Sequence, residues 1–457
     1  MGRMKRHLIS TLIFLSMLSS VSSAEPVYEV TYDRFRAPLF HGSPFGEKIS
    51  LHVAKISLKE KLTGVPTILL NGGPGNSAAN IARRYQQSNT FPAYFEPFLQ
   101  NGPLYLLDQR GTGASGPKWA CPENPNLDVM RKGTRSAYIE RAIINADWCK
   151  SKFQNFNHVA NALTVTESIH DIESLRRHIR TEKINLLAVS FGTQLGLAYM
   201  KKYPNHVEKA ALLLVLGTGQ TYGLPHNFDN AIRALDVQRK SMGKSRLYPA
   251  LEKFGEDLEK RLEPITITLP ETGETVQFNL SDYEYQSFLI KSMRKGFDDK
   301  LARAIEKNNY ISPAKAAYRW RKNTRFNLVR AAMRCSSGMS FKRMLQIERQ
   351  RKTSLVGHAI TGTYPEICQH LKIQQSGKSF RKNLDTDIPI IAFSGNLDPR
   401  TPPRYVEEIS GGWKKFIHVI DSTGYHNFCE KEACIKELQQ FLDQSVDTIH
   451  SRRVEVD

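Results

Sequence analysis

The chain has 457 residues, a formal net charge of +19 at pH 7 and six cysteines. This length exceeds one average domain and fits one large α/β domain that carries an insertion. The positive charge is spread along the chain, although residues 226–385 hold 30 Lys and Arg against 17 Asp and Glu. Because no nucleic-acid-binding motif accompanies this charge, we expect no nucleic-acid partner. Anionic polymers or acidic substrates suit such a surface better.

Residues 1–24 have the pattern of a secretory signal peptide that is cleaved after Ala24. The segment starts with the basic residues Arg3, Lys5 and Arg6. An apolar run follows at 8–21, and the small residues 22–24 end the segment. No later apolar stretch is long enough to span a bilayer. We therefore expect an exported protein, periplasmic or secreted, with no integral membrane segment after signal removal. The sequence leaves its oligomeric state open.

The six cysteines agree with export, because disulfides persist outside the reducing cytosol. Pairing each cysteine with its neighbour in the sequence gives three bonds, although other connectivities remain open: Cys121–Cys149, Cys335–Cys368 and Cys429–Cys434. No CxxC or HExxH spacing occurs among the cysteines and the 13 histidines. We therefore expect no metal site.

The first half of the mature chain alternates strand-like and helix-like segments. Strands are predicted at 27–34, 49–56, 67–70, 103–107, 184–189 and 210–215, and helices at 164–180 and 194–202. Thr164 and Glu167 have the spacing of a capping box for the first of these helices. Such alternation indicates an α/β fold with a mostly parallel sheet that helices cover on both faces.

The alternation stops after the strand at 210–215. Residues 223–385 are mostly helix-patterned and basic, apart from a hairpin-like piece at 265–278, so we interpret them as a helical insertion over the strand ends. Strands resume at 388–393 and 416–420, followed by a helix at 432–444 and a frayed tail from Ile449. The predicted organisation is a core in two parts, 25–222 and 386–457, interrupted by a lid at 223–385.

Ser190 lies between a short buried strand and a helix, and this strand–turn–helix pattern is that of a nucleophile elbow. Ala188 and Gly192 supply the small residues that the tight turn needs on either side. The start of the following helix favours developing negative charge. The alternative is that Ser190 only caps the helix, as serine often does.

A nucleophilic serine needs a base, and the base needs an orienting carboxylate. Asp398 and His426 follow the two resumed strands in the order serine, acid, histidine. Because parallel strands end at one edge of the sheet, we expect all three side chains to meet there. Asp421 competes for the acid role but lies close to His426 in the sequence, and His418 lies within a strand.

The oxyanion of an acyl-transfer intermediate needs backbone N–H donors, each contributing roughly 3 kcal/mol. We predict the N–H of Phe191, which directly follows the serine, and that of Gly72, in the loop 71–75. Glycines allow a backbone to approach the substrate closely. The same loop does not fit a phosphate-binding loop, because no GK[ST] follows it.

Five motifs occur in an order that resembles the proline iminopeptidase and tripeptidyl-aminopeptidase branch of the α/β-hydrolases. They are Asn71-Gly72-Gly73-Pro74-Gly75, the segment 108–115, Ala188-Val189-Ser190-Phe191-Gly192, Gly395-Asn396-Leu397-Asp398 with Thr401-Pro402, and Gly424-Tyr425-His426. The resemblance implies an α/β-hydrolase fold with an inserted helical lid. It also implies Ser190, Asp398 and His426 as catalytic residues, Gly72 and Phe191 as oxyanion donors, and structural roles for Asp108 and Arg110.

Several positions depart from the pattern of the family. Asn71 stands where histidine is usual, Ala188 where glycine is usual and Tyr425 where a small residue is more common. Ser336 follows Cys335 where the family often has an acidic residue. An aminopeptidase must bind an ammonium group, so another carboxylate of the insertion could serve instead. Glu284 is our candidate, Asp282, Asp298 and Asp299 are the others, and a solvated surface position is the alternative for each.

The sequence therefore predicts an exported serine hydrolase that needs no cofactor. Its expected activity is that of an aminopeptidase that releases residues from free peptide N-termini through an acyl-enzyme on Ser190. The alternative enzyme is a carboxylesterase or lipase acting on small esters, since the same three residues serve both reactions. A binding protein without activity on the same fold is a third interpretation.

Overall fold

The structure is a computed structural model that describes residues 28–58, 64–88, 90–127, 132–269, 271–294, 296–297, 299–323 and 325–457. The predicted signal peptide, residues 1–24, lies outside the described residues.

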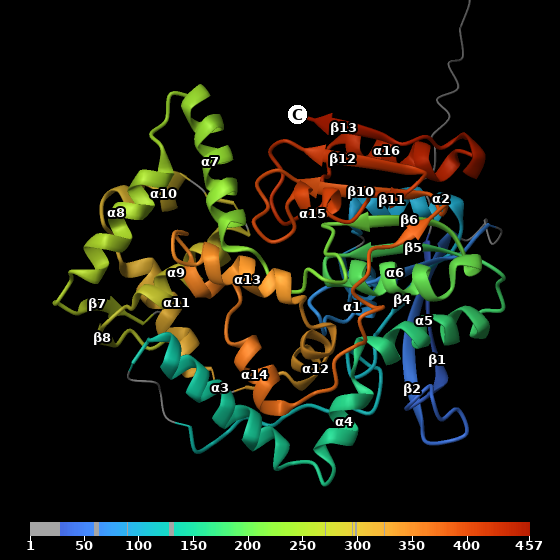
Figure 1. Cartoon of the computed structure of the whole chain (residues 1–457), viewed down its shortest axis with the longest axis horizontal. Helices are drawn as coiled ribbons and strands as arrows, with labels where there is room; N and C mark the ends of the chain where they lie inside the picture. Colours follow the sequence, from blue (N-terminus) through green and yellow to red (C-terminus); the bar gives the residue numbers. More distant parts are fainter. Residues whose placement is uncertain are drawn as a thin grey trace, which may run out of the picture.

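One large sheet, on the right in Figure 1, is the centre of the α/β core. Within the described residues it has nine strands in the order β1-β2-β4-β3-β5-β6-β10-β12-β13, and two small sheets pair β11 with β9 and β7 with β8. The strands are β1 (Tyr28–Pro38), β2 (Lys48–Leu58), β3 (Thr67–Leu70), β4 (Leu104–Leu107), β5 (Ile184–Val189), β6 (Val207–Leu213), β7 (Ile265–Thr268), β8 (Thr275–Phe278), β9 (Asp385–Thr386), β10 (Ile390–Gly395), β11 (Gly412–Trp413), β12 (Phe416–Asp421) and β13 (Arg452–Val456).

The large sheet is mostly parallel. β2 pairs antiparallel with β1 and β4, whereas every pair from β4 to β13 is parallel. The central strands are short and buried on both faces, as expected where helices cover a parallel sheet. Their carboxyl ends therefore meet at one edge of the sheet, where open α/β sheets bind ligands.

The α-helices are α1 (Ala79–Ser88), α2 (Glu96–Asn101), α3 (Arg135–Lys150), α4 (Phe156–Ala162), α5 (Val165–His178), α6 (Phe191–Lys202), α7 (Pro225–Ser241), α8 (Leu247–Glu259), α9 (Asp282–Met293), α10 (Asp299–Glu306), α11 (Ile311–Lys322), α12 (Leu328–Ser337), α13 (Phe341–Gln350), α14 (Tyr364–Leu371), α15 (Pro403–Glu407) and α16 (Glu432–Asp443). Short 3-10 helices lie at Ala93–Phe95, Pro204–His206, Gly357–Ile360 and Val446–Thr448.

Two apolar layers cover the sheet, one on each face. Apolar side chains of α1, α2 and α16 pack with Leu69 and Leu187, while those of α5 and α6 pack with Ile68 and Leu186. Successive residues of β3 and β5 thus point to opposite faces, which is the period of a strand. This packing holds the strand ends, and the residues that follow them, in a rigid frame.

The helices between β6 and β10 form a group beside the sheet, coloured green to orange in Figure 1. We name residues 225–371, which hold α7 to α14, the helical insertion. α7 to α11 share an apolar core of their own, in which Leu397 of the segment after β10 takes part. α12 instead packs with α4 and α5 in the main core. A lid with boundaries at 223 and 385 stays a prediction.

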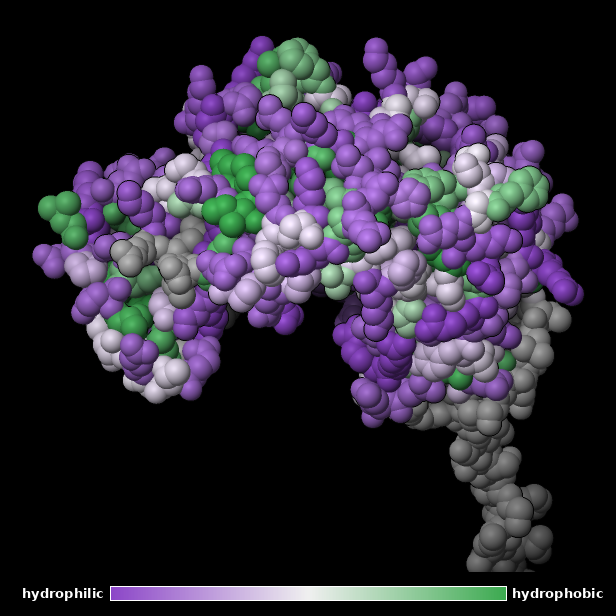
Figure 2. Space-filling view, turned by 90° about the horizontal axis from the view of Figure 1, so that it is seen from below, coloured by the Kyte–Doolittle hydropathy of each residue, from purple (hydrophilic) through white to green (hydrophobic). Residues whose placement is uncertain are grey.

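Figure 2 shows the molecule from the side of α3 and α14. This face is mostly hydrophilic and is hollowed between the insertion, on the left, and the sheet-bearing part, on the right. None of the described helices has the length and apolar character that crossing a membrane requires.

Three local predictions were wrong. The last residues do not fray: β13 adds a parallel edge strand to β12, with Val454 opposite Val419. α6 begins at Phe191, three residues earlier than predicted, because the turn at Ser190 leads directly into the helix. The Thr164 side chain forms no capping hydrogen bond, and the Glu167 carboxylate accepts one from the backbone of His41.

The disulfide pairing of sequence neighbours is confirmed. The structure contains Cys121–Cys149, Cys335–Cys368 and Cys429–Cys434. The first bond tethers α3 to the loop after β4, and the second joins α12 to α14.

Candidate functional site

Ser190 occupies a strained turn at the end of β5. Its φ of 52° lies in the left-handed region, which costs a non-glycine residue of order 1–3 kcal/mol and tends to occur at functional sites. The Ser190 side chain forms no capping hydrogen bond with α6, so the interpretation as a simple cap is wrong. A methyl group on Gly192 would lie 1.9 Å from the carbonyl oxygen of Leu70, which explains the small residue there.

His426 lies between Ser190 and Asp398. Its Nε2 is 3.3 Å from the Ser190 Oγ, and its Nδ1 is 2.7 Å from the Asp398 Oδ2. One imidazole thus connects a hydroxyl and a carboxylate that are more than 200 residues apart in the sequence. The three residues predicted from their order along the chain are therefore brought together.

The Asp398 carboxylate is fully buried. Burial alone would raise its pKa, but the nearby His426, a hydrogen bond from the Thr401 hydroxyl and one from the backbone N–H of Arg400 lower the pKa of Asp398 below its usual value. Asp398 therefore stays ionised at neutral pH and can accept the hydrogen bond of the His426 Nδ1.

Backbone hydrogen bonds join the loops that carry Asp398 and His426. The N–H of Leu397 donates to the carbonyl of Gly424 at 2.9 Å, and the N–H of Asn396 donates to that of Asp421 at 2.9 Å. Asp421, the competing acid, instead receives bonds from Lys431 and Thr423 and forms no bond with His426 in the described residues. His418, which was set aside as a base, is buried against Ser394.

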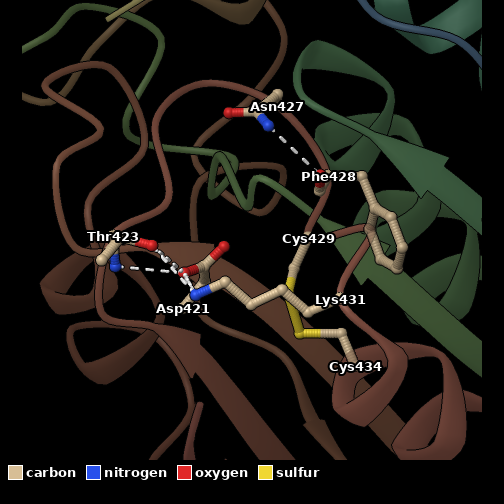
Figure 3. The surroundings of a disulfide bond; sticks show 7 residues. All are labelled: Asp421, Thr423, Asn427, Phe428, Cys429, Lys431 and Cys434. Atoms are coloured by element: carbon tan, nitrogen blue, oxygen red, sulfur yellow. Dashed lines mark hydrogen bonds and ion pairs between the residues drawn. A yellow bond between two sulfur atoms is a disulfide. The ribbon is translucent and has the colours of Figure 1, made fainter. Parts of the chain in front are cut away.

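A disulfide and an ion pair hold the loop that carries His426. In Figure 3, the disulfide Cys429–Cys434 lies beside the Lys431–Asp421 ion pair. The disulfide joins the loop to the start of α16, and the ion pair joins it to the end of β12. The Lys431 Nζ is 2.7 Å from the Asp421 Oδ1. His426 lies between Asp421 and Cys429 in the sequence, so the ion pair and the disulfide restrict the segment that positions its imidazole.

The two predicted oxyanion donors differ in their surroundings. Phe191 is the first residue of α6, where an N–H has no partner within its own helix. The N–H of Gly72 donates to the Oδ1 of Asn71 at 2.8 Å, so Asn71 already occupies this donor. A methyl group on Gly72 would lie 2.9 Å from the Ser190 Cβ and 3.5 Å from the Phe191 nitrogen, which places the loop directly beside the serine.

The structure gives Glu284 a different partner from the one predicted. Its buried carboxylate accepts 2.6 Å hydrogen bonds from both the Nε and the Nη2 of Arg321. Further bonds come from the Tyr138 hydroxyl and from Ser281, with which Glu284 forms a capping box at the start of α9. Because Arg321 neutralises this carboxylate, the prediction that Glu284 binds the substrate amine is wrong.

Asp108 and Arg110 are both fully buried, and their structural roles stay a prediction. Asp108 accepts hydrogen bonds from Ser77 and from His52, while Arg110 forms an ion pair with Asp171 at 2.6 Å. Neither group contacts Ser190, Asp398 or His426 through a hydrogen bond in the described part of the chain.

Sequence reasoning missed three polar groups near the site: Thr401, whose hydroxyl binds Asp398, and two arginines, Arg330 and Arg400. The Arg330 Nε donates to the carbonyl of Pro74 in the Gly72 loop at 3.2 Å. Thr401 belongs to a motif that the resemblance includes, so it was within reach of prediction. Arg330 had no signal apart from the basic composition of the insertion. The described residues contain no group of acidic, histidine and cysteine side chains that would hold a metal ion.

The chain belongs to the family described as the alpha/beta hydrolase fold, which its residues 66–433 match. It is similar to a tripeptidyl aminopeptidase of Streptomyces lividans, with 26% identity over 185 residues, which are 38% of this chain and 33% of that protein. A probable proline iminopeptidase of Streptomyces coelicolor is 28% identical over 149 residues, 33% of this chain and 32% of that protein. The predicted resemblance to this peptidase branch is thus confirmed at low identity.

The similarity to these relatives is partial, because the matched region spans about a third of their length. The serine protease Hip1 of Mycobacterium tuberculosis shows the same pattern, with 23% identity over 187 residues, 39% of this chain and 34% of that protein. Among solved structures, a 2-hydroxy-6-oxo-6-phenylhexa-2,4-dienoate hydrolase from Rhodococcus aligns over 91% of this chain and 99% of its own, with 13% identity and a TM-score of 0.40. A likeness at that score carries no argument about the reaction.

Proposed function

We propose that the protein is a serine hydrolase that cleaves peptide bonds through an acyl-enzyme on Ser190. The observation that carries the proposal is the imidazole of His426, with one nitrogen toward the Ser190 Oγ and the other bonded to the Asp398 carboxylate. Such a pairing turns a weak hydroxyl nucleophile into an effective one, because the proton has a base to receive it.

In the proposed reaction, the Ser190 Oγ attacks the scissile carbonyl while the His426 Nε2 takes its proton. The C–N bond then breaks, and His426 returns the proton to the leaving amine. Water, deprotonated by the His426 Nε2, then attacks the resulting ester. The bond between the acyl carbon and the Ser190 Oγ breaks as His426 returns the proton to this oxygen, which releases the acid and free Ser190. Asp398 remains ionised throughout and stabilises the imidazolium.

We propose the N–H of Phe191 as the first oxyanion donor. The N–H of Gly72 serves as the second oxyanion donor only when the Asn71 side chain rotates away from it. While this N–H donates to the Asn71 Oδ1, it stabilises the oxyanion less than a free N–H would.

The peptide substrate is proposed from the names of the relatives, which are peptidases. Release from free N-termini, the aminopeptidase reaction, belongs to the same proposal, although Glu284 no longer supplies its ammonium site. A small-ester hydrolase uses the same three residues and stays the alternative.

Matched chromogenic peptides with free and acetylated N-termini, together with a short-chain nitrophenyl ester, separate these activities. We expect the peptides with free N-termini to be hydrolysed. For the acetylated peptides, kcat/KM should be at least about tenfold lower, because a free ammonium is the recognition group of an aminopeptidase. Equal rates on both peptides would contradict the aminopeptidase proposal, and cleavage of the ester alone would replace the peptide by an ester substrate.

We also propose export of the protein. The signal-peptide pattern at residues 1–24 and the three disulfides support it. N-terminal sequencing of the protein from a cell envelope or culture medium is expected to begin at Glu25, and a protein that retains Met1 in the cytoplasm would contradict export.

A further inference from the structure

A cluster of arginines lies beside the loop of Gly72, which in turn contacts Ser190. Arg330, in the first turn of α12, donates to the carbonyl of Pro74, only two residues from Gly72. The start of α12 packs on the same loop, since a methyl group on Gly75 would lie 3.7 Å from the Val329 side chain. The guanidinium of Arg330 is thus fixed next to the loop that touches Ser190.

Arg334 follows Arg330 by one helical turn, so both side chains lie on one face of α12. Its guanidinium is 4.6 Å from the centre of the Tyr364 ring, an arrangement that holds a flat cation in place. The Nε of Arg334 is buried and has no hydrogen-bond partner among the described residues. A buried donor without a partner is costly unless a ligand supplies the acceptor.

Arg400 supplies a third cation from the loop of Asp398. Its backbone N–H donates to the Asp398 Oδ1 at 2.8 Å, while its guanidinium is close enough to Arg330 and Arg334 to feel their charge. Burial, and then the like charges of Arg334, Arg294 and Arg330, lower the pKa of Arg400 to about 10. It remains a cation at neutral pH.

These arginines form no ion pairs within the described residues, although the charge of Asp398 acts on Arg400 and raises its pKa against the effect of the neighbouring arginines. In the part of the chain that the structure describes, Arg330, Arg334 and Arg400 form no ion pair with a carboxylate, in contrast to the paired Arg110 and Arg321. The Asp398 carboxylate forms its hydrogen-bonded pair with His426, and the Glu366 carboxylate, on the same helix as Tyr364, forms its ion pair with Arg135. Like charges held together without a counter-ion favour the binding of an anion.

We infer that Arg330, Arg334 and Arg400 form a subsite that binds a carboxylate group of the substrate close to the scissile bond. The inference rests on the proposed function, because it places this carboxylate on the peptide that Ser190 cleaves. Two sources provide the same chemistry: the side chain of an acidic residue, or the free carboxyl terminus of a short peptide. Guanidinium groups bind either one through paired, charge-assisted hydrogen bonds.

Two sets of alanine tetrapeptides with free N-termini separate the sources. In the first set, Glu or Gln replaces each alanine in turn; in the second, the carboxyl terminus is free or amidated. We expect kcat/KM, measured by mass spectrometry of the products, to be about tenfold higher for the charged member of one pair. A preference for Glu at one position assigns the subsite to an acidic side chain, and a preference for the free terminus assigns it to the main-chain carboxylate.

The Arg334→Gln variant is expected to remove this preference, by lowering kcat/KM for the charged peptide about tenfold and leaving the neutral one within about twofold. Arg334→Lys keeps the charge and should retain part of the preference. Arg349→Gln, which removes the same charge from an exposed position on α13, is the matched control and should behave as the wild type.

Labelling of Ser190 by a fluorophosphonate separates a failure of the subsite from a failure of the proposed hydrolase function. The reagent needs an activated serine but no carboxylate on the substrate. A labelled protein that shows no preference in either set, or an Arg334→Gln variant that weakens charged and neutral peptides equally, overturns the subsite and leaves the hydrolase intact. A protein that neither takes the label nor cleaves any peptide overturns the proposed function together with the subsite.

Discussion

Alanine in place of Ser190 is expected to lower kcat for the peptide substrate by roughly 10⁴-fold or more, as removal of a nucleophile does in serine hydrolases. The Ser190 Oγ is the only group within hydrogen-bond distance of the His426 Nε2 in the described residues. Without it no acyl-enzyme forms, and only slow attack by water remains.

The same substitution should leave the fold intact. The Ser190 side chain does not cap α6, and alanine has no larger Cβ to accommodate in the turn. We therefore expect a free energy of unfolding within about 1 kcal/mol of the wild type. Ser88→Ala, at an exposed helix end, is the control for the substitution itself. Activity near the wild-type level in Ser190→Ala would remove the proposed nucleophile.

The largest loss of stability is expected from Asp171→Ala. The Asp171 carboxylate is buried and accepts hydrogen bonds from the Arg110 Nε and Nη2 at 2.7 and 2.6 Å, as well as from His41. Removing it leaves the fully buried guanidinium of Arg110 without its counter-charge. Breaking one partner of such a pair costs about 3–5 kcal/mol.

Urea unfolding, followed by circular dichroism with the disulfides intact, measures this loss. Glu271→Ala is the matched control, because it breaks an ion pair with Arg319 in which both side chains are more than half exposed. Exposed pairs contribute about 0–1 kcal/mol. A similar shift of the midpoint in both variants would contradict a structural role for the buried pair.

The sequence predicted best what depends on local pattern. The bounds of β3 and β5 agree residue for residue, because short runs of buried aliphatic residues between turn residues define such strands. The positions of Ser190, Asp398 and His426 followed from the parallel sheet, in which the carboxyl ends of neighbouring strands must meet. Order along the chain was therefore enough to assemble these three.

The remaining features depend on contacts between distant segments, which a single sequence does not reveal. Glu284 was available as an amine site until Arg321, on another helix, was found to neutralise it. The final strand β13 has exposed charged residues, and it is ordered by pairing with β12 and by packing Val454 and Val456 against a distant part of the core. The capture of the Gly72 N–H by Asn71 depends on one side-chain rotation, for which no sequence pattern exists.

The proposed activation of Ser190 is open to a direct measurement: treatment of the folded protein with a fluorophosphonate, followed by digestion and mass spectrometry. We predict one label per chain, located on Ser190 and absent from the Ser190→Ala and His426→Ala variants, because the reagent reacts with a serine that a neighbouring base activates. A label on another serine, or peptide hydrolysis by a protein whose Ser190 stays unlabelled, would contradict the assignment of Ser190 as the nucleophile.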